Sequence, residues 1–258
     1  MLNITDIQPR FSLILLDEAQ NISPALIRCI ALLAENNNII YFSGEQQSIK
    51  HHISNIEMIK SHYYDRGIQL SEHHLKASHR CPPQVARLAN KVMSIKRIIV
   101  GGVTEQDEQV EMISAVSSGD YNMSWLTPAE MMEKAADLGI NTAAFAIVTR
   151  PCYKEEIKGR LPLATVFTVD EAQGLGFKNL LVYKVFSPIT REIAQAIGKD
   201  DKTNRTLRGD AHIALKTDLD ILITAITRAE GHITIVEENQ TRHDLSLIHI
   251  SEPTRPER

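Results

Sequence analysis

A short apolar run that ends in two carboxylates constrains the fold of this chain more than any other segment. Residues 11–16 read Phe-Ser-Leu-Ile-Leu-Leu, and Asp17-Glu18-Ala19-Gln20 follows directly. An apolar run of this length between polar residues is typical of a central strand in a parallel sheet. Ligands of such sheets bind at the carboxyl ends of the strands. The pattern therefore predicts a ligand-binding edge at which one carboxylate holds Mg²⁺ and its neighbour takes a proton from an attacking water.

The rest of the sequence alternates apolar runs with helical periodicity, which indicates an α/β protein with mostly parallel sheets. Ser-Pro and Thr-Pro pairs at residues 23–24 and 127–128 are typical of helix starts. Further strands are predicted at residues 39–42, 143–149, 164–169, 180–185 and 233–236. Helices are predicted to start at residue 24 and to cover about 48–60, 82–93, 127–138, 153–158, 187–198 and 218–229.

A domain boundary is predicted between about residues 65 and 75. The part before it is too short for a complete α/β nucleotide-binding domain, and the part after it is long enough for one. Residues 1–74 are therefore expected to be the C-terminal part of a first domain, and residues 75–244 a second domain. Residues 245–255 resemble the in-frame translation of a sequencing adapter, so a disordered tail is expected at 245–258.

Composition narrows the class of protein. There are 28 Lys and Arg against 32 Asp and Glu, a formal charge of −4, which excludes a strongly basic nucleic-acid coat protein. The charge remains compatible with an enzyme that binds a single nucleic-acid strand in a local groove by stacking on its bases. The three cysteines form no Cys-x-x-Cys pair, so neither a disulfide framework nor a zinc knuckle is supported. No apolar span suits a bilayer and no signal peptide is recognisable, so we expect a cytoplasmic protein without a membrane partner.

Five further motifs follow the acidic tetrad. They are Gln47-Ser48-Ile49, Ser78-His79-Arg80 with Ala89-Asn90, residues 146–150, residues 168–177 and residues 224–229. In kind and order the six segments resemble motifs II, III, IV, IVa, V and VI of superfamily 1 helicases of the UvrD/Rep type, over about residues 11–236. The resemblance implies RecA-like (P-loop NTPase) parallel sheets, an incomplete first domain and a second RecA-like domain. It also implies ATP and Mg²⁺ as ligands, and single-stranded nucleic acid as partner, with DNA favoured over RNA.

The resemblance also implies roles for residues of the first domain. Asp17 matches the Mg²⁺-binding aspartate, and Glu18 matches the catalytic glutamate. Gln20 matches a residue near the γ-phosphate, and Gln47 matches a glutamine that senses the nucleotide. The plain alternatives are an acidic pair that favours a helix dipole and, for Gln47, a polar loop residue.

In the second domain, Arg80 and Arg228 match two arginines that reach the γ-phosphate, where a guanidinium neutralises charge on the transferred phosphoryl group. Arg228 lies in a mostly apolar segment that we expect to be a buried helix, so its charge needs a defined partner. Gly174 would let the backbone approach a phosphate or sugar, and Thr168 could bind the nucleic-acid backbone. The plain alternatives are solvated arginines and an ordinary strand-to-loop turn.

The chain also departs from the family pattern. It contains no Gly-x-x-x-x-Gly-Lys-Ser/Thr phosphate loop, so it cannot hold ATP in the usual way by itself. Gly44-Glu45 lies one residue closer to Gln47 than the usual Gly-Asp, and Gly176 stands where the family has a glutamate that contacts the ribose. We therefore expect a fragment that is inactive alone and whose partner is the missing N-terminal half of the same protein.

Two alternatives stay open. The first is a non-hydrolysing module derived from a helicase, which binds nucleic acid or another protein. The second is a different P-loop ATPase without unwinding activity, which shares the acidic pair but does not predict the pairing of Arg80 with Arg228.

Overall fold

The computed structural model of this chain describes residues 8–43, 56–73, 77–100, 114–115, 122–140, 142, 145–187 and 210–241. The chain divides into two compact units, Met1–His74 and Leu75–Arg258. Gln47, most of the helix predicted at 187–198 and the tail predicted at 245–258 lie outside the described residues. No helix within the described part of the chain is long and apolar enough to cross a lipid bilayer.

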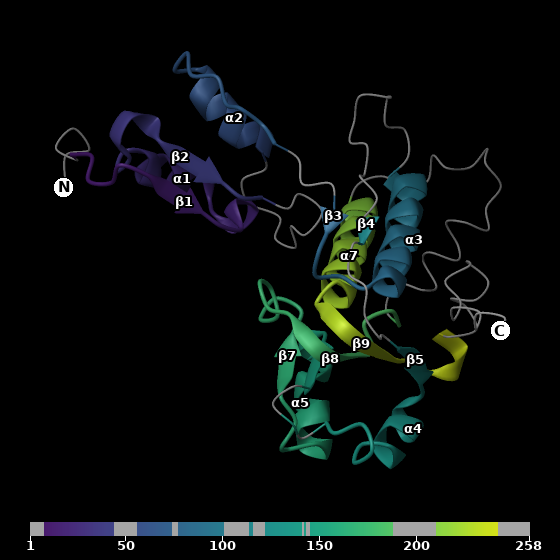
Figure 1. The fold of residues 1–258 in the computed structure, drawn as a ribbon. Helices are drawn as coiled ribbons and strands as arrows, with labels where there is room; N and C mark the ends of the chain where they lie inside the picture. Colours follow the sequence, from purple (N-terminus) through teal and green to yellow (C-terminus); the bar gives the residue numbers. More distant parts are fainter. Residues whose placement is uncertain are drawn as a thin grey trace. The chain divides into compact units, whose positions relative to one another are not determined.

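The first unit contains a two-stranded parallel sheet in which Ile14 of β1 lies opposite Ile39 of β2 (Figure 1). Its elements are β1 (Ile14–Leu16), η2 (Ala19–Asn21), α1 (Pro24–Ala31), η3 (Glu35–Asn37), β2 (Ile39–Tyr41) and α2 (Ile56–Tyr64). The Ser23 hydroxyl accepts a hydrogen bond from the Leu26 amide, and Pro24 fills the first helical position. The predicted start of α1 is thus confirmed.

Helices α1 and α2 cover one face of this sheet. The core between them contains Ala19, Ile27, Ala31, Ile59 and Tyr63, with Ile39 and Tyr41 of β2 packed against it. The Tyr41 and Tyr63 hydroxyl oxygens are 2.6 Å apart, so each hydroxyl of this half-buried pair has a partner. The sheet and the two helices therefore share a single core.

The second unit contains a five-stranded sheet in the order β5-β9-β8-β6-β7, with every pair parallel. Its strands are β5 (Met123–Leu126), β6 (Phe145–Thr149), β7 (Val166–Thr168), β8 (Phe177–Tyr183) and β9 (Ala229–Val236). Its helices are α3 (Pro83–Val100), α4 (Pro128–Glu133), α5 (Pro151–Arg160) and α7 (Asp210–Ile226). The short strands β3 (Ala77–Ser78) and β4 (Ser114–Ala115) pair separately. The predicted α/β class is confirmed, and an all-parallel sheet flanked by helices is consistent with a RecA-like fold.

Helices cover both faces of the five-stranded sheet (Figure 1). On one face, Met131 of α4 and Ile157 of α5 pack with Ile147, Leu181 and Tyr183 of the central strands. Helices α3 and α7 lie side by side on the other face. All five residues of β6 are buried, which is expected of a parallel strand between two helical layers.

Several predicted bounds were wrong, since α4 ends at Glu133 instead of about residue 138 and α7 begins at Asp210 instead of about residue 218. The short strand β3 was not predicted. Strands β8 and β9 begin earlier than predicted. Their first residues include exposed or half-buried polar side chains, which interrupt the apolar run in the sequence. Helix α7 ends at Ile226, so Arg228 lies in the turn before β9 and not inside the helix as predicted. Strand β5 reads Met-Ser-Trp-Leu and was not predicted.

Candidate functional site

The acidic pair lies at the carboxyl end of β1. Asp17 is exposed and Glu18 is half-buried. Glu18 has φ 48° and ψ 42°, the left-handed region, and its amide donates a hydrogen bond to Asp17 Oδ1 at 2.8 Å. The next residue, Ala19, is fully buried, and its amide donates to the Phe42 carbonyl just after β2. Because a non-glycine residue in this region is strained by about 1–2 kcal/mol, the turn depends on these anchors, which fix it between the ends of both strands.

The donor groups at this turn fit Mg²⁺ held jointly with a nucleotide. No cluster of three or more His, Cys, Asp or Glu that could enclose a metal is found among the described residues. Mg²⁺ is commonly bound through one or two carboxylates plus substrate phosphates, so one exposed carboxylate such as that of Asp17 meets the requirement. The backbone of Gln20 belongs to the short helix that follows the pair, η2.

Arg80 and Arg228, which are far apart in the sequence, both belong to the second unit. Arg80 is exposed, shortly after β3, while Arg228 is 1% exposed. Both act on the thiol of Cys81, which is 2% exposed. Burial raises the pKa of this thiol to about 11, and the nearby charges of Arg80 and Arg228 oppose the increase. Both guanidinium groups are therefore close enough to Cys81 to affect its ionisation.

The Arg228 side chain also has a structural role. Its Nε donates to the Thr224 carbonyl at 3.1 Å, and its Nη1 donates to the Leu175 carbonyl at 3.4 Å. Basic side chains near a helix C-terminus commonly satisfy its last carbonyl groups. Arg228 thereby joins the end of α7 to the segment before β8. The expected need of this buried charge for defined partners is met by backbone carbonyls, which the sequence pattern did not identify.

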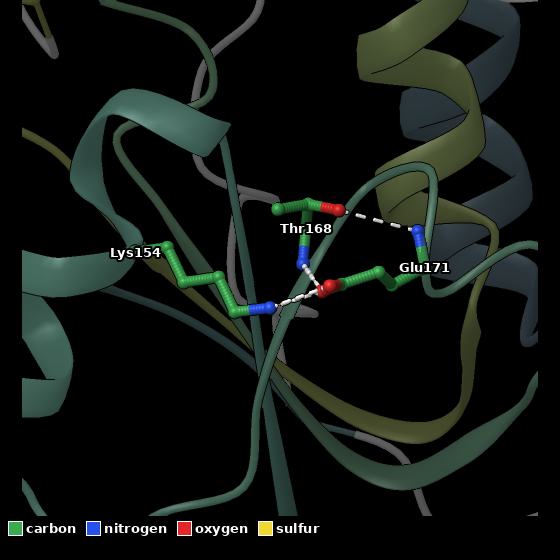
Figure 2. Close-up of polar contacts among 3 residues, drawn as sticks. All are labelled: Lys154, Thr168 and Glu171. Carbon is green, nitrogen blue, oxygen red and sulfur yellow. Dashed lines mark hydrogen bonds and ion pairs between the residues drawn. The ribbon is translucent and has the colours of Figure 1, made fainter.

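Thr168 ends β7 and belongs to a local hydrogen-bonded turn (Figure 2). Its hydroxyl accepts from the Glu171 amide at 3.2 Å, and its own amide donates to Glu171 Oε2 at 2.8 Å. Lys154 Nζ lies 2.6 Å from Glu171 Oε1. The hydrogen bond from Lys154, followed by that from the Thr168 amide, lowers the pKa of Glu171. Sequence reasoning missed Lys154 and Glu171, although Thr-x-x-Glu at 168–171 has capping-box spacing.

Gly174 and Gly176 lie in the same segment, and glycine is favoured at each position for a different structural reason. Gly174 has φ +75°, and a Cβ placed there would contact nothing, so its conformation alone favours glycine. A Cβ at Gly176 would overlap the Glu230 side chain. Glycine at 176, where the family resemblance leads us to expect glutamate, thus leaves room for a carboxylate that comes from β9.

The carboxyl edge of the five-stranded sheet holds two further charged residues to which sequence reasoning assigned no role, although Arg150 ends the motif at residues 146–150. Arg150 follows β6; its Nε donates to the Val185 carbonyl at 3.1 Å, and its Nη1 lies 2.5 Å from Asp218 Oδ1. Glu237 follows β9 and is fully buried. The available signal was a charged residue directly after an apolar strand, the pattern that singled out Asp17.

No model of a known protein family matches the sequence, and no curated protein matches it. Among solved structures, the chain is similar to the C-terminal domain of a possible DNA helicase from Lactobacillus plantarum WCFS1. The identity is 13% and the TM-score is 0.33, and the alignment covers 62% of this chain and 86% of that chain. Because a TM-score this low does not show a shared fold, the function has to be inferred from this chain's own residues.

Proposed function

We propose that this chain is the C-terminal portion of an ATP-dependent superfamily 1 helicase. The intact enzyme binds ATP and Mg²⁺ between two RecA-like domains and closes the cleft around them. After hydrolysis the cleft opens, and the enzyme steps along a single strand of nucleic acid, with DNA favoured over RNA, and separates duplexes. The fragment alone lacks the phosphate loop and is inactive.

The observation that carries this proposal is Arg228, a buried arginine that bonds the end of α7 and the segment before β8, while its charge and that of Arg80 both act on the Cys81 thiol. The two arginines belong to separate motifs, and an ATPase whose second domain neutralises charge on the transferred phosphoryl group needs guanidinium groups gathered at one place. A P-loop ATPase of another kind does not predict that the arginines of these two motifs act together. The acidic turn after β1 supports the same function, because it sets a carboxylate at the edge where parallel sheets bind ligands.

The proposed roles follow from the chemistry of each residue. Asp17 holds Mg²⁺, which when bound neutralises phosphate charge. Glu18 accepts the proton of the attacking water, and Gln20 and Gln47 contact the nucleotide. In the second unit, Gly174 allows close approach of a phosphate or sugar, and Thr168 contacts the nucleic-acid backbone.

A non-hydrolysing binding module is the second candidate. Two of the proposed functional groups already have partners within the chain, since the Thr168 hydroxyl bonds the Glu171 amide and the Arg228 guanidinium bonds two carbonyls. In a module these contacts would be the whole role of both side chains. Measurement of ATP turnover separates the two functions.

Glu18→Gln in the intact protein is expected to lower single-strand-stimulated ATP turnover by at least about a hundredfold, because it removes the general base. ATP binding should be retained, since the amide has nearly the same shape. Turnover and nucleotide affinity are measured for both proteins, with the exposed Glu35→Gln as matched control. Unchanged turnover in Glu18→Gln would remove Glu18 from this role, and an intact protein without ATP turnover would favour the binding module.

Arg228→Ala is expected to reduce turnover by about a thousandfold or more, as loss of an arginine finger does. Because this side chain also holds the end of α7, thermal unfolding is measured in parallel. Arg160→Ala, which removes a half-exposed guanidinium of the same unit, is the control. A folded Arg228→Ala variant with wild-type turnover would show that Arg228 serves the structure only.

A further inference from the structure

Thr168, at the carboxyl end of β7, bonds Glu171 through two of its polar groups (Figure 2). Its hydroxyl accepts from the Glu171 amide, and its amide donates to a carboxylate oxygen of Glu171. Thr168 as a whole is 9% exposed. A ligand that contacts Thr168 therefore has to compete with the Glu171 side chain for the same groups.

The Glu171 carboxylate gathers donors from two elements. Lys154, in the first half of α5, places its Nζ 2.6 Å from Oε1 and 2.5 Å from Oε2. The Thr168 amide, on the edge strand of the described sheet, donates to Oε2 at 2.8 Å. Lys154, then the Thr168 amide and, more weakly, the Thr168 hydroxyl lower the pKa of Glu171. An ammonium, an amide and a hydroxyl thus face a single anion.

The two members of this ion pair differ in how freely they can leave it. The Lys154 side chain is 17% exposed, whereas the Glu171 side chain is 48% exposed. Ion pairs at a surface are only weakly stabilised, so the carboxylate can turn into water at little cost while the ammonium stays beside β7. Lys154 would then lack an anionic partner. Another anion can take the place that the carboxylate leaves.

A phosphate has the chemistry to do so. Lysine, backbone amides and threonine hydroxyls all bond the phosphate oxygens of nucleic acids, and bonds in which both groups are charged are the stronger ones. We propose that Glu171 occupies the position of a backbone phosphate of single-stranded nucleic acid, and that Lys154 binds this phosphate once the strand displaces the carboxylate. This inference rests on the proposed function, in which Thr168 contacts the backbone. Glu171 thereby lowers the affinity of the free site.

The first test is Glu171→Gln in the full chain, with binding of a fluorescein-labelled oligothymidylate measured by fluorescence anisotropy at low salt. Glutamine retains the Thr-x-x-Glu/Gln spacing that holds the turn, but it removes the charge that competes with phosphate. Affinity should rise about two- to fivefold, the range that corresponds to a surface ion pair. Glu155→Gln, at an exposed position of α5, removes the same charge nearby and is the matched control, expected to bind as wild type does.

Lys154→Met should weaken binding and lower the slope of log affinity against log salt by about 0.7, the value for one phosphate contact on a single strand. Lys158→Met, at an exposed position of the same helix, is its control. In the double variant Lys154→Met/Glu171→Gln the gain from Glu171→Gln should vanish, because that gain depends on Lys154.

Unchanged or weaker binding in Glu171→Gln would overturn the inference, since Glu171 would then only hold the turn. A gain that persists without Lys154, or no strand binding by any of these proteins, would overturn it as well. Inorganic phosphate that binds with this variant pattern while strand binding stays constant would refute the assignment to nucleic acid. An intact protein that shows the expected pattern but does not hydrolyse ATP would contradict the helicase proposal and leave the roles of Lys154 and Glu171 established.

Discussion

At the scale of single residues, Glu237 is a carboxyl group that the fold removes from water. It is fully buried at the end of β9, where it accepts hydrogen bonds from the Phe186 amide and the Ser187 hydroxyl. The charge of Lys184 also acts on it, and Lys184 Nζ is 2.9 Å from a carboxylate oxygen of the neighbouring Glu238. Burial raises the pKa of Glu237 to about 7, although the hydrogen bonds and Lys184 oppose the increase.

This pKa predicts how stability depends on pH. Because the pKa is higher in the folded state than the ordinary value of 4.5, the folded chain binds more protons between pH 4.5 and 7. The free energy of unfolding should therefore fall as pH rises through this interval, by roughly 3 kcal/mol at most. Glu237→Gln should remove this decline, and the exposed Glu238→Gln should keep it. Denaturant unfolding at several pH values measures this free energy. An equal dependence on pH for Glu237→Gln and wild type would contradict the raised pKa of Glu237.

Sequence reasoning could predict residue types at the site better than their contacts. Asp17 and Glu18 were placed at a strand end because an apolar run precedes them, and β1 confirms that position. The burial of Arg228 was expected from its apolar neighbours. Its bond to Leu175 and the contact between Gly176 and Glu230 were not predictable, because both join segments whose register depends on the assembled sheet.

At the scale of elements, the packing of α3 on α7 includes a buried ion pair. Lys96 Nζ lies 2.6 Å from Asp220 Oδ1, and the two side chains are 8% and 6% exposed. Removal of one partner leaves a charge in an apolar interface. Replacement of both partners by apolar residues removes the desolvation cost along with the attraction.

Lys96→Met is therefore expected to lower the free energy of unfolding by about 3 kcal/mol, and adding Asp220→Leu should recover most of that loss. Arg160→Met, which breaks the more exposed pair with Glu156, should cost less than about 1 kcal/mol. Chemical denaturation of the four proteins provides the comparison. Equal losses for the Lys96 and Arg160 variants would show that the buried pair contributes no more than a surface pair.

Local capping signals were the most reliable guide to elements. The predicted Thr127–Glu130 capping box is confirmed, with the Glu130 amide 3.2 Å from the Thr127 hydroxyl. Strand β5 was missed because its four residues include a serine, and four residues are too few to show a period. The Ser124 hydroxyl lies 3.0 Å from that of Thr234 on β9, so this polar position is satisfied only when the strands pair.

At the scale of the whole molecule, the proposed function requires the two units to respond to one nucleotide. The acidic turn belongs to the first unit, and the arginine pair belongs to the second. A triphosphate that contacts both would tie the distance between the units to the state of the nucleotide. The sequence predicts the residues on each side, but the coupling itself is a property of the assembled protein.

The most direct test is a distance between the units, measured by pulsed electron spin resonance on the intact protein. Cys29 in the first unit and Cys152 in the second are exposed and suit spin labels, whereas Cys81 is buried. With all other cysteines outside this chain replaced, a non-hydrolysable ATP analogue with Mg²⁺ should shorten and narrow the distance distribution, and Arg228→Ala should weaken that change. A distribution that stays the same at saturating analogue would contradict the claim that ATP binds between the two units.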